Sequence, residues 1–100
     1  MTHKIVWRQT AQGDLENLYD WIAGQAGGET AYEYTSRIKG HVDKLADLPG
    51  WGAPREELGP GVRTIAYRRR TVIAYLVKAE SVEILGVFHG GRAVVGAFDE

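Results

Sequence analysis

The chain has 100 residues, of which 44% are hydrophobic and 25% are charged, a globular composition that excludes a disordered protein. It has no cysteine, which excludes a disulfide framework and thiolate metal sites and fits a reducing cytoplasm. The net charge of −1 gives no general attraction to nucleic acid, and no uncharged stretch reaches the ~18 residues of a membrane span. We therefore expect one cytoplasmic domain over residues 1–100, with no membrane association and no sequence-specific DNA binding by this chain alone.

The first elements are a short strand and an amphipathic helix. Lys4–Trp7 is prone to form a strand, and Thr10 stands where a helix N-cap is expected. The apolar residues that follow are spaced i, i+4, i+7, i+8 and i+11, namely Ala11, Leu15, Leu18, Tyr19 and Ile22. This spacing predicts a helix with one buried stripe. Three glycines within Gly24–Gly28 predict a loop of the length that joins two helices.

A second amphipathic helix is predicted from about Glu29 to Pro49-Gly50. Its apolar positions repeat with the helical period at Ala31, Tyr34, Ile38, Val42 and Leu45. Two such helices joined by a short loop form an antiparallel hairpin that cannot bury its apolar stripe by itself. We expect this hairpin to pack on one face of a sheet.

Three β-prone segments follow an irregular connection over Pro49–Gly61. Thr71–Val77 carries no charge and is rich in β-branched and aromatic residues, which predicts a central strand between Val62–Tyr67 and Ser81–His89. Strict alternation in the last segment would direct Val82, Ile84 and Phe88 to one face and Glu83, Leu85, Val87 and His89 to the other.

The predicted fold class is therefore α+β. An antiparallel sheet, made of the N-terminal strand and the C-terminal three-stranded meander, is covered on one face by the N-terminal helical hairpin. The opposite face and the groove beside it are expected to stay open, which suggests a partner.

Motifs for catalysis are weak in this chain. The histidines His3, His41 and His89 are not placed beside a serine in a nucleophile-elbow sequence, and no His/Cys or carboxylate cluster has metal-ligand spacing. We therefore expect no catalytic residue, no metal and no cofactor. His41 is interpreted as a packing residue of the second helix.

A cationic cluster is the remaining candidate for function: Arg63, Arg68, Arg69, Arg70, His89 and Arg92. Guanidinium groups bind phosphates and carboxylates, so this cluster is compatible with RNA cleavage, nucleic-acid contact or recognition of an acidic peptide. The Arg68-Arg69-Arg70 run can equally be a solvated hairpin turn, because charge runs usually lie at the surface. Spacing alone leaves these alternatives open.

The chain resembles the RelE/ParE toxins of bacterial type II toxin–antitoxin pairs, on the ParE side, over about residues 4–93. The segments that carry the resemblance are Ala11-x-x-Asp14-Leu15-Glu16-x-Leu18-Tyr19-x-Trp21-Ile22, Leu45-x-x-Leu48-Pro49-x-x-Gly52-x-Pro54-Arg55, Glu57-Leu58-Gly59-Pro60-Gly61-Val62-Arg63, Val72-Ile73-x-Tyr75 and Val82-x-Ile84-x-x-Val87-x-His89-Gly90-x-Arg92. The resemblance implies the fold described above, a ParD-like antitoxin that wraps the toxin in a hetero-oligomer, and inhibition of DNA gyrase without chemistry by the toxin.

RelE-like relatives instead cut mRNA on the ribosome with basic residues and a C-terminal tyrosine. Here Val72 stands three residues before Tyr75, where an arginine is common, and no tyrosine follows Arg92. The alternatives are a RelE-like ribonuclease that uses Arg63, Arg70, His89 and Arg92, or a non-toxic binding module.

The candidate binding residues follow from chemistry. Buried aromatic and apolar side chains dominate interface energies, and arginines pair with acidic residues. The predicted antitoxin contacts are Trp21, Trp51, Leu58, Arg63, Arg70 and Arg92. The predicted contacts to the toxin's target are Arg63, Arg70, His89 and Arg92.

Overall fold

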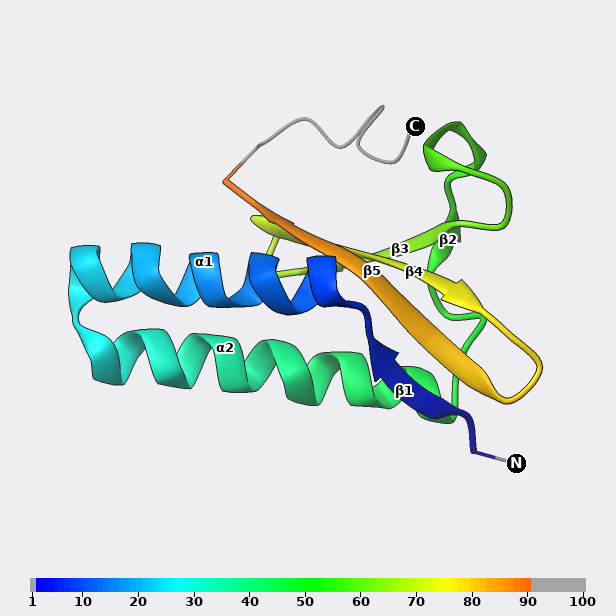
Figure 1. Ribbon diagram of the computed structural model, residues 1–100, viewed down its shortest axis with the longest axis horizontal. Coiled ribbons are helices and arrows are strands. Elements are labelled where there is room, and N and C mark those ends of the chain that lie inside the picture. The colour runs from blue at the N-terminus through cyan, green and yellow to red at the C-terminus, as the bar shows by residue number, and fades with distance from the viewer. Residues whose placement is uncertain (1, 91–100) are drawn as a thin grey trace.

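A computed structural model describes residues 2–90, in which two antiparallel helices lie against one face of a five-stranded sheet (Figure 1). The elements in chain order are β1 Lys4–Trp7, α1 Gln9–Ala26, α2 Gly28–Asp43, the 3₁₀ helix η1 Lys44–Ala46, β2 Ala53–Pro54, the 3₁₀ helix η2 Glu56–Leu58, β3 Arg63–Tyr67, β4 Thr71–Val77 and β5 Ser81–His89. Neither helix in this part of the chain is long and apolar enough to cross a membrane.

The strand order is β1-β5-β4-β3-β2, so the expected meander with Thr71–Val77 in the middle is confirmed. The sheet is nevertheless mixed. β1 pairs with β5 in parallel, from Lys4 opposite Ser81 to Trp7 opposite Ile84. The expectation of a purely antiparallel sheet was wrong for β1. The chain passes from β1 into α1, and when it later forms β5 beside β1, the two strands run in the same direction. The two-residue strand β2, which pairs with β3, was not predicted.

The ends of α1 differ from the prediction. The N-cap position is Arg8, and Thr10 lies inside the first turn. Its hydroxyl donates a hydrogen bond to the carbonyl of Leu85 in β5 at 2.8 Å. At the other end the helix continues through Gly24 to Ala26, and Gly27 alone, with φ of 96°, turns the chain into α2. One residue with a left-handed φ is enough for this turn, so the predicted five-residue loop was too long.

The main core lies between the helices and the sheet. The apolar stripes of α1 and α2 pack there against inward side chains of β3, β4 and β5, including Ile65, Ile73 and Tyr75. Tyr75 has no exposed surface, and its hydroxyl accepts a hydrogen bond from the Gly52 N–H and donates one to the Pro49 carbonyl, both at 2.8 Å. The central strand therefore also holds the connection between α2 and β3.

A β-bulge in β5 corrects the predicted alternation of faces. Ala74 is opposite Gly86 and Tyr75 is opposite Ile84, so Leu85 is an extra residue on β5. Beyond the bulge the faces exchange. Val87 packs in the main core, and Phe88 packs with Leu85 on the opposite face. Alternation without a bulge had assigned Val87 and Phe88 to the wrong faces, because one inserted residue shifts the period-2 pattern.

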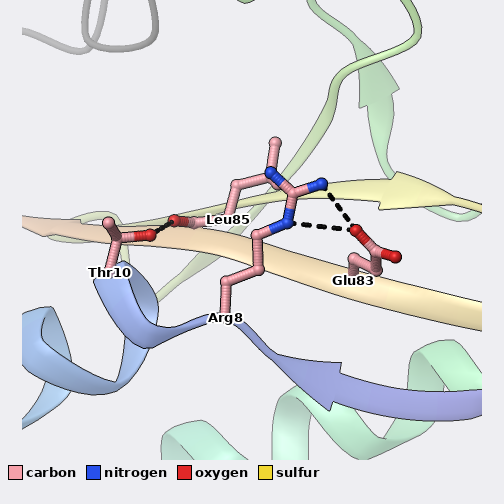
Figure 2. A network of polar contacts seen from close by, with 4 residues as sticks. All are labelled: Arg8, Thr10, Glu83 and Leu85. Atoms are coloured by element: carbon pink, nitrogen blue, oxygen red, sulfur yellow. Dashed lines mark hydrogen bonds and ion pairs between the residues drawn. The ribbon is translucent and has the colours of Figure 1, made fainter.

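The start of α1 is attached to β5 beside this bulge. In Figure 2, Thr10 points to the Leu85 carbonyl, and the Arg8 guanidinium lies over β5 toward Glu83. The Arg8 Nη2 to Glu83 Oε1 distance is 2.6 Å, and Nε donates to the same oxygen at 3.0 Å. A bulge leaves its extra residue outside the regular ladder, so the Thr10 hydroxyl supplies a partner for the carbonyl of that residue.

The opposite face of the sheet is less open than expected. The segment that contains η2 folds over it, and a small apolar cluster forms there from Leu58, Val62, Ala74 and Leu85, with Leu76 and Phe88 packed beside it. A hollow of about 680 Å³ remains next to this cluster. The face is therefore open only in part, because the irregular connection contributes its own apolar side chains.

Candidate interaction surface

Six aromatic rings form a continuous row along the side of the molecule where the helical hairpin meets the ends of β3, β4 and β5. We call this set the aromatic row. In order, its members are Trp21, His89, Tyr34, Tyr67, His41 and Trp51. The distances between successive ring centroids are 5.5, 5.8, 5.5, 5.2 and 5.0 Å. All five pairs are tilted or edge-to-face, the arrangements that aromatic pairs prefer.

The row is assembled from five separate segments of the chain. Tyr34 and His41 are seven residues apart on α2, so they lie on the same side of that helix. Tyr67 and His89 are the last residues of β3 and β5. The tryptophans stand at the two ends, Trp21 on α1 and Trp51 in the connection before β2, with 54% and 45% of their surface exposed. The row therefore ends in two large aromatic side chains that solvent reaches.

The buried hydroxyl of Thr71 links Tyr34 to His89. Thr71 at the start of β4 has no exposed surface. Its Oγ1 lies 2.9 Å from the Tyr34 hydroxyl and 2.8 Å from Nδ1 of His89. These two hydrogen bonds fix the plane of the His89 ring, because one of its two nitrogens is held by the core.

His89 is neutral at physiological pH. Burial lowers the pKa of its imidazole below the ordinary value of 6.5, and the nearby positive charge of Arg70 lowers this pKa further. A neutral imidazole has one N–H donor and one bare nitrogen acceptor. With Nδ1 directed at Thr71, Nε2 is the nitrogen left for contacts outside the core.

The turn between β3 and β4 carries the three successive arginines. Arg68 and Arg69 both have positive φ, 55° and 67°. Left-handed backbone costs an L-residue about 1–2 kcal/mol, and hairpin turns that need it usually contain asparagine and glycine. The Arg68 guanidinium lies 5.4 Å from the centre of the Tyr67 ring, a cation–π contact. Arginines at strained turn positions beside an exposed aromatic surface are consistent with a binding role.

His41 protects a strand edge. β2 covers only Arg63 and Thr64 of β3, so the rest of that edge has no neighbouring strand. Nε2 of His41 lies 3.0 Å from the Ala66 carbonyl on this edge. This contact confirms the interpretation of His41 as a packing residue, and it blocks one backbone group that an added strand would use.

The predicted contact residues occupy different environments. Arg63 donates from Nη1 to the Gly52 carbonyl at 2.6 Å and to the Gly50 carbonyl at 3.3 Å, so its guanidinium braces the Trp51 connection. Leu58 has no exposed surface and belongs to the apolar cluster on the opposite sheet face, so it is not an exposed anchor in this conformation. Arg92 lies outside the described residues.

The structure therefore brings Trp21, His89 and Arg70 together at one end of the aromatic row, where the Arg70 carbonyl also accepts a hydrogen bond from the Gly90 N–H at 2.9 Å. At the other end, Arg63 donates hydrogen bonds to the carbonyls of Gly50 and Gly52, on either side of Trp51. The sequence interpretation did not identify Tyr34, Tyr67 and Thr71 as members of this surface. The seven-residue spacing of Tyr34 and His41 was a usable signal, since it places two aromatic rings on one side of α2.

The side chains of this surface are aromatic rings, imidazoles and guanidinium groups. Residues 2–90 contain no group of three or more His, Asp or Glu side chains arranged to hold a metal ion. What the row offers is aromatic area, a neutral imidazole and flanking guanidinium groups. Tyrosine, tryptophan and arginine side chains are enriched at protein interfaces.

Comparison with known proteins identifies the family of the chain. Residues 5–94 match the sequence profile of the family described as the ParE toxin of the type II toxin-antitoxin system, parDE. A protein named Toxin ParE1 from Caulobacter vibrioides is 32% identical over 87 residues, which cover 86% of this chain and 91% of that relative. A Toxin ParE1 from Mycobacterium tuberculosis is 22% identical over 89 residues, covering 89% of this chain and 91% of the relative.

Solved structures show the same fold. A chain of the chromosomal ParDE toxin-antitoxin system from P. aeruginosa superposes with a TM-score of 0.78 at 28% identity, over 88% of this chain and 96% of that one. A chain of the RelBE2 toxin-antitoxin complex from Mycobacterium tuberculosis gives a TM-score of 0.61 at 23% identity, over 90% of this chain and all of that one. The family profile covers most of the chain, and the protein belongs to the ParE family of type II toxin–antitoxin toxins.

Proposed function

We propose that this ParE-family toxin inhibits DNA gyrase when it is free and is neutralised by a ParD-like antitoxin in a hetero-oligomer, both in the cytoplasm. The observation that carries the proposal is the aromatic row, with exposed tryptophans at both ends and arginines beside it. Exposed tryptophan and arginine side chains are characteristic anchors of protein interfaces. Support for the antitoxin comes from family membership and from the P. aeruginosa structure, which is described as a ParDE system.

In this proposal the toxin acts by binding and not by catalysis. His89 and Arg63 already have partners within the fold, Thr71 for the imidazole and two backbone carbonyls for the guanidinium. Such residues suit a rigid contact surface. The antitoxin is expected to contact Trp21 and Trp51, with Arg63, Arg70 and Arg92 pairing with its acidic residues.

A second candidate function is ribonuclease activity of the RelE type. The observation that favours it is His89, whose lowered pKa keeps its imidazole neutral beside the positive charge of Arg70. A neutral imidazole accepts a proton, and a neighbouring guanidinium stabilises phosphate charge. Against it, Val72 stands where a cation would assist the nuclease, and no tyrosine follows Arg92.

One experiment separates the two functions. The chain is expressed without a partner, and growth, supercoiling by purified gyrase and ribosome-dependent mRNA cleavage are measured side by side. We expect growth arrest, loss of supercoiling and intact mRNA, with growth restored by co-expression of a ParD-like antitoxin. Cleavage of mRNA that is abolished by Arg92→Ala, with supercoiling unaffected, would establish the ribonuclease instead.

A further inference from the structure

A pocket of about 410 Å³ lies between α1 and the end of β5, at the Trp21 end of the aromatic row. α1 contributes residues at positions i, i+3, i+4 and i+7, which share one side of the helix. The lining side chains that matter here are Asp14, Asn17, Leu18 and Trp21 from α1, and Val87 and His89 from β5. Polar and aromatic groups therefore converge on one hollow beside Trp21, which the proposed antitoxin contact also includes.

The aromatic wall of the pocket is made by Trp21 and His89. Their ring centroids are 5.5 Å apart, with planes inclined by 56°. The hydrogen bond between Thr71 and Nδ1 of His89 fixes the imidazole, and more than half of the Trp21 surface is exposed to solvent. A ligand can therefore lie against the indole without displacing core side chains. Indole is also the aromatic group that cations prefer.

The lining of the pocket includes the carboxylate of Asp14. Oδ2 of Asp14 accepts a hydrogen bond from the Val87 N–H at 3.0 Å, which orients the group toward β5. Gly86 leaves room for this approach, since an added Cβ there would lie 3.2 Å from the same oxygen. None of the ion pairs within residues 2–90 includes Asp14. Its second oxygen therefore remains able to accept hydrogen bonds from a ligand.

The chemistry of the two groups suits an arginine side chain. Seven residues of helix separate Asp14 from Trp21, a rise of about 10 Å, and helical side chains lean toward the N-terminus, which directs the indole toward the carboxylate. Arginine has a long apolar stem that lies flat on an aromatic ring and a forked head that matches a carboxylate.

The electrostatics of the pocket are compatible with a cation. His89 is neutral at pH 7, so the wall beside Trp21 adds no positive charge. Arg70 is the positive charge that acts on His89, after the larger effect of burial. Its side chain is exposed on the β3–β4 turn, so solvent and salt screen its repulsion of a bound guanidinium.

We propose that this pocket binds an arginine side chain presented by a protein partner, with the stem on the Trp21 indole and the guanidinium on the Asp14 carboxylate. This assignment is independent of whether the toxin inhibits gyrase or cleaves RNA. It also differs from the acidic partner groups expected at Arg63 and Arg70, since here the toxin supplies the negative charge.

The test uses the full chain and small probes. N-acetyl-arginine amide is titrated into ¹⁵N-labelled protein and followed by NMR, with N-acetyl-citrulline amide as the neutral probe of nearly the same shape. A single side chain is expected to bind in the millimolar range, with saturable shifts of the Trp21 indole N–H and of the Val87 and Gly90 amides. The citrulline probe is expected to cause no saturable shift. Equal shifts with both probes would overturn the assignment.

Matched variants identify the groups. Asp14→Asn keeps an acceptor for the Val87 N–H but removes the charge, and should weaken arginine binding at least about fivefold. Asp20→Asn makes the same chemical change on the same helix, at a cavity between α1 and α2 that also contains Lys39, and should leave the affinity unchanged. Trp21→Ala should weaken binding similarly without unfolding the protein. A folded Asp14→Asn or Trp21→Ala protein with wild-type affinity would refute the proposal, whatever the result of the gyrase assay.

Discussion

Tyr75 illustrates how a single side chain links the central strand to the irregular connection. Its hydroxyl accepts from the Gly52 N–H and donates to the Pro49 carbonyl, and Arg63 donates to carbonyls of the same connection. These bonds satisfy backbone groups that would otherwise lie buried without partners. The connection therefore holds Trp51 in a defined place at the end of the aromatic row, although it contains little regular structure.

Gly52→Ala is expected to destabilise the protein by about 1–3 kcal/mol, because overpacking a buried site strains its neighbours. A Cβ at Gly52 would lie 2.6 Å from the Tyr75 hydroxyl oxygen and 2.7 Å from the Thr64 carbonyl oxygen, and the latter belongs to the backbone. Urea unfolding measures the effect. Gly50→Ala is the matched control, since a Cβ there meets no atom within 4 Å, and it should change stability by less than about 0.5 kcal/mol. Equal stability of the two variants would contradict the close packing at Gly52.

His89 should make stability depend on pH. The pKa of its imidazole is lower in the folded state than the ordinary value of 6.5. The neutral imidazole therefore contributes its full share of stability at pH values above 6.5. This contribution is lost as the pH falls through the folded-state pKa. His89→Asn keeps a polar group near the Nδ1 position but cannot be protonated. We expect the loss of unfolding free energy between about pH 7.5 and about pH 5.5 to be smaller in this variant than in the wild type. Parallel pH profiles would show that His89 is not desolvated.

At the scale of elements, the order and type of the helices and long strands could be predicted from the spacing of hydrophobic residues. The β-bulge in β5 could not be predicted in this way. The bulge at Leu85 depends on how β5 meets β4 and α1, and its carbonyl is bonded by Thr10, 75 residues away. No pattern within Ser81–His89 reports such a contact. The side of the sheet on which Val87 and Phe88 lie therefore follows from tertiary structure.

The β3–β4 turn offers a test of strain. Replacing Arg68 and Arg69 by asparagine and glycine should raise stability by about 1 kcal/mol, because these residues adopt positive φ at little cost, while the cation–π contact of Arg68 with Tyr67 is lost. For a domain of this size the melting temperature should rise by about 4–8 °C. Arg70→Asn, where φ is not positive, is the control for removal of charge and should not stabilise the protein. A double variant that melts at or below the wild-type temperature would show that the turn is unstrained.

At the scale of the whole molecule, the packing of a helical layer on a sheet could be predicted from the sequence. The arrangement of side chains on the interaction surface could not. The helical hairpin on a sheet with a central Thr71–Val77 strand is confirmed. The aromatic row is built from segments far apart in the chain, so its continuity appears only after folding. Leu58 shows the opposite error. It was predicted to contact the antitoxin because it is an apolar residue in a proline- and glycine-rich segment, but the chain itself buries it.

Trp51 connects the fold with the proposed antitoxin. Its side chain is 45% exposed and touches His41 by an edge-to-face contact, so the core does not depend on it. Trp51→Ala should therefore leave the melting temperature within a few degrees of wild type. If the aromatic row anchors the antitoxin, the variant should bind a purified ParD-like antitoxin at least tenfold more weakly, about 1.4 kcal/mol.

Tyr32→Ala is the matched control for Trp51→Ala in calorimetric titration with the same antitoxin. Tyr32 is a large aromatic residue with 68% of its surface exposed, and no ring contact joins it to the aromatic row in the part of the chain that the structure describes. Its loss should leave affinity unchanged, which separates a specific anchor from general loss of exposed apolar area. Similar weakening by both variants would assign the effect to apolar area rather than to the row. Wild-type affinity of a folded Trp51→Ala protein would remove Trp51 from the interface, and unfolding would return it to the core.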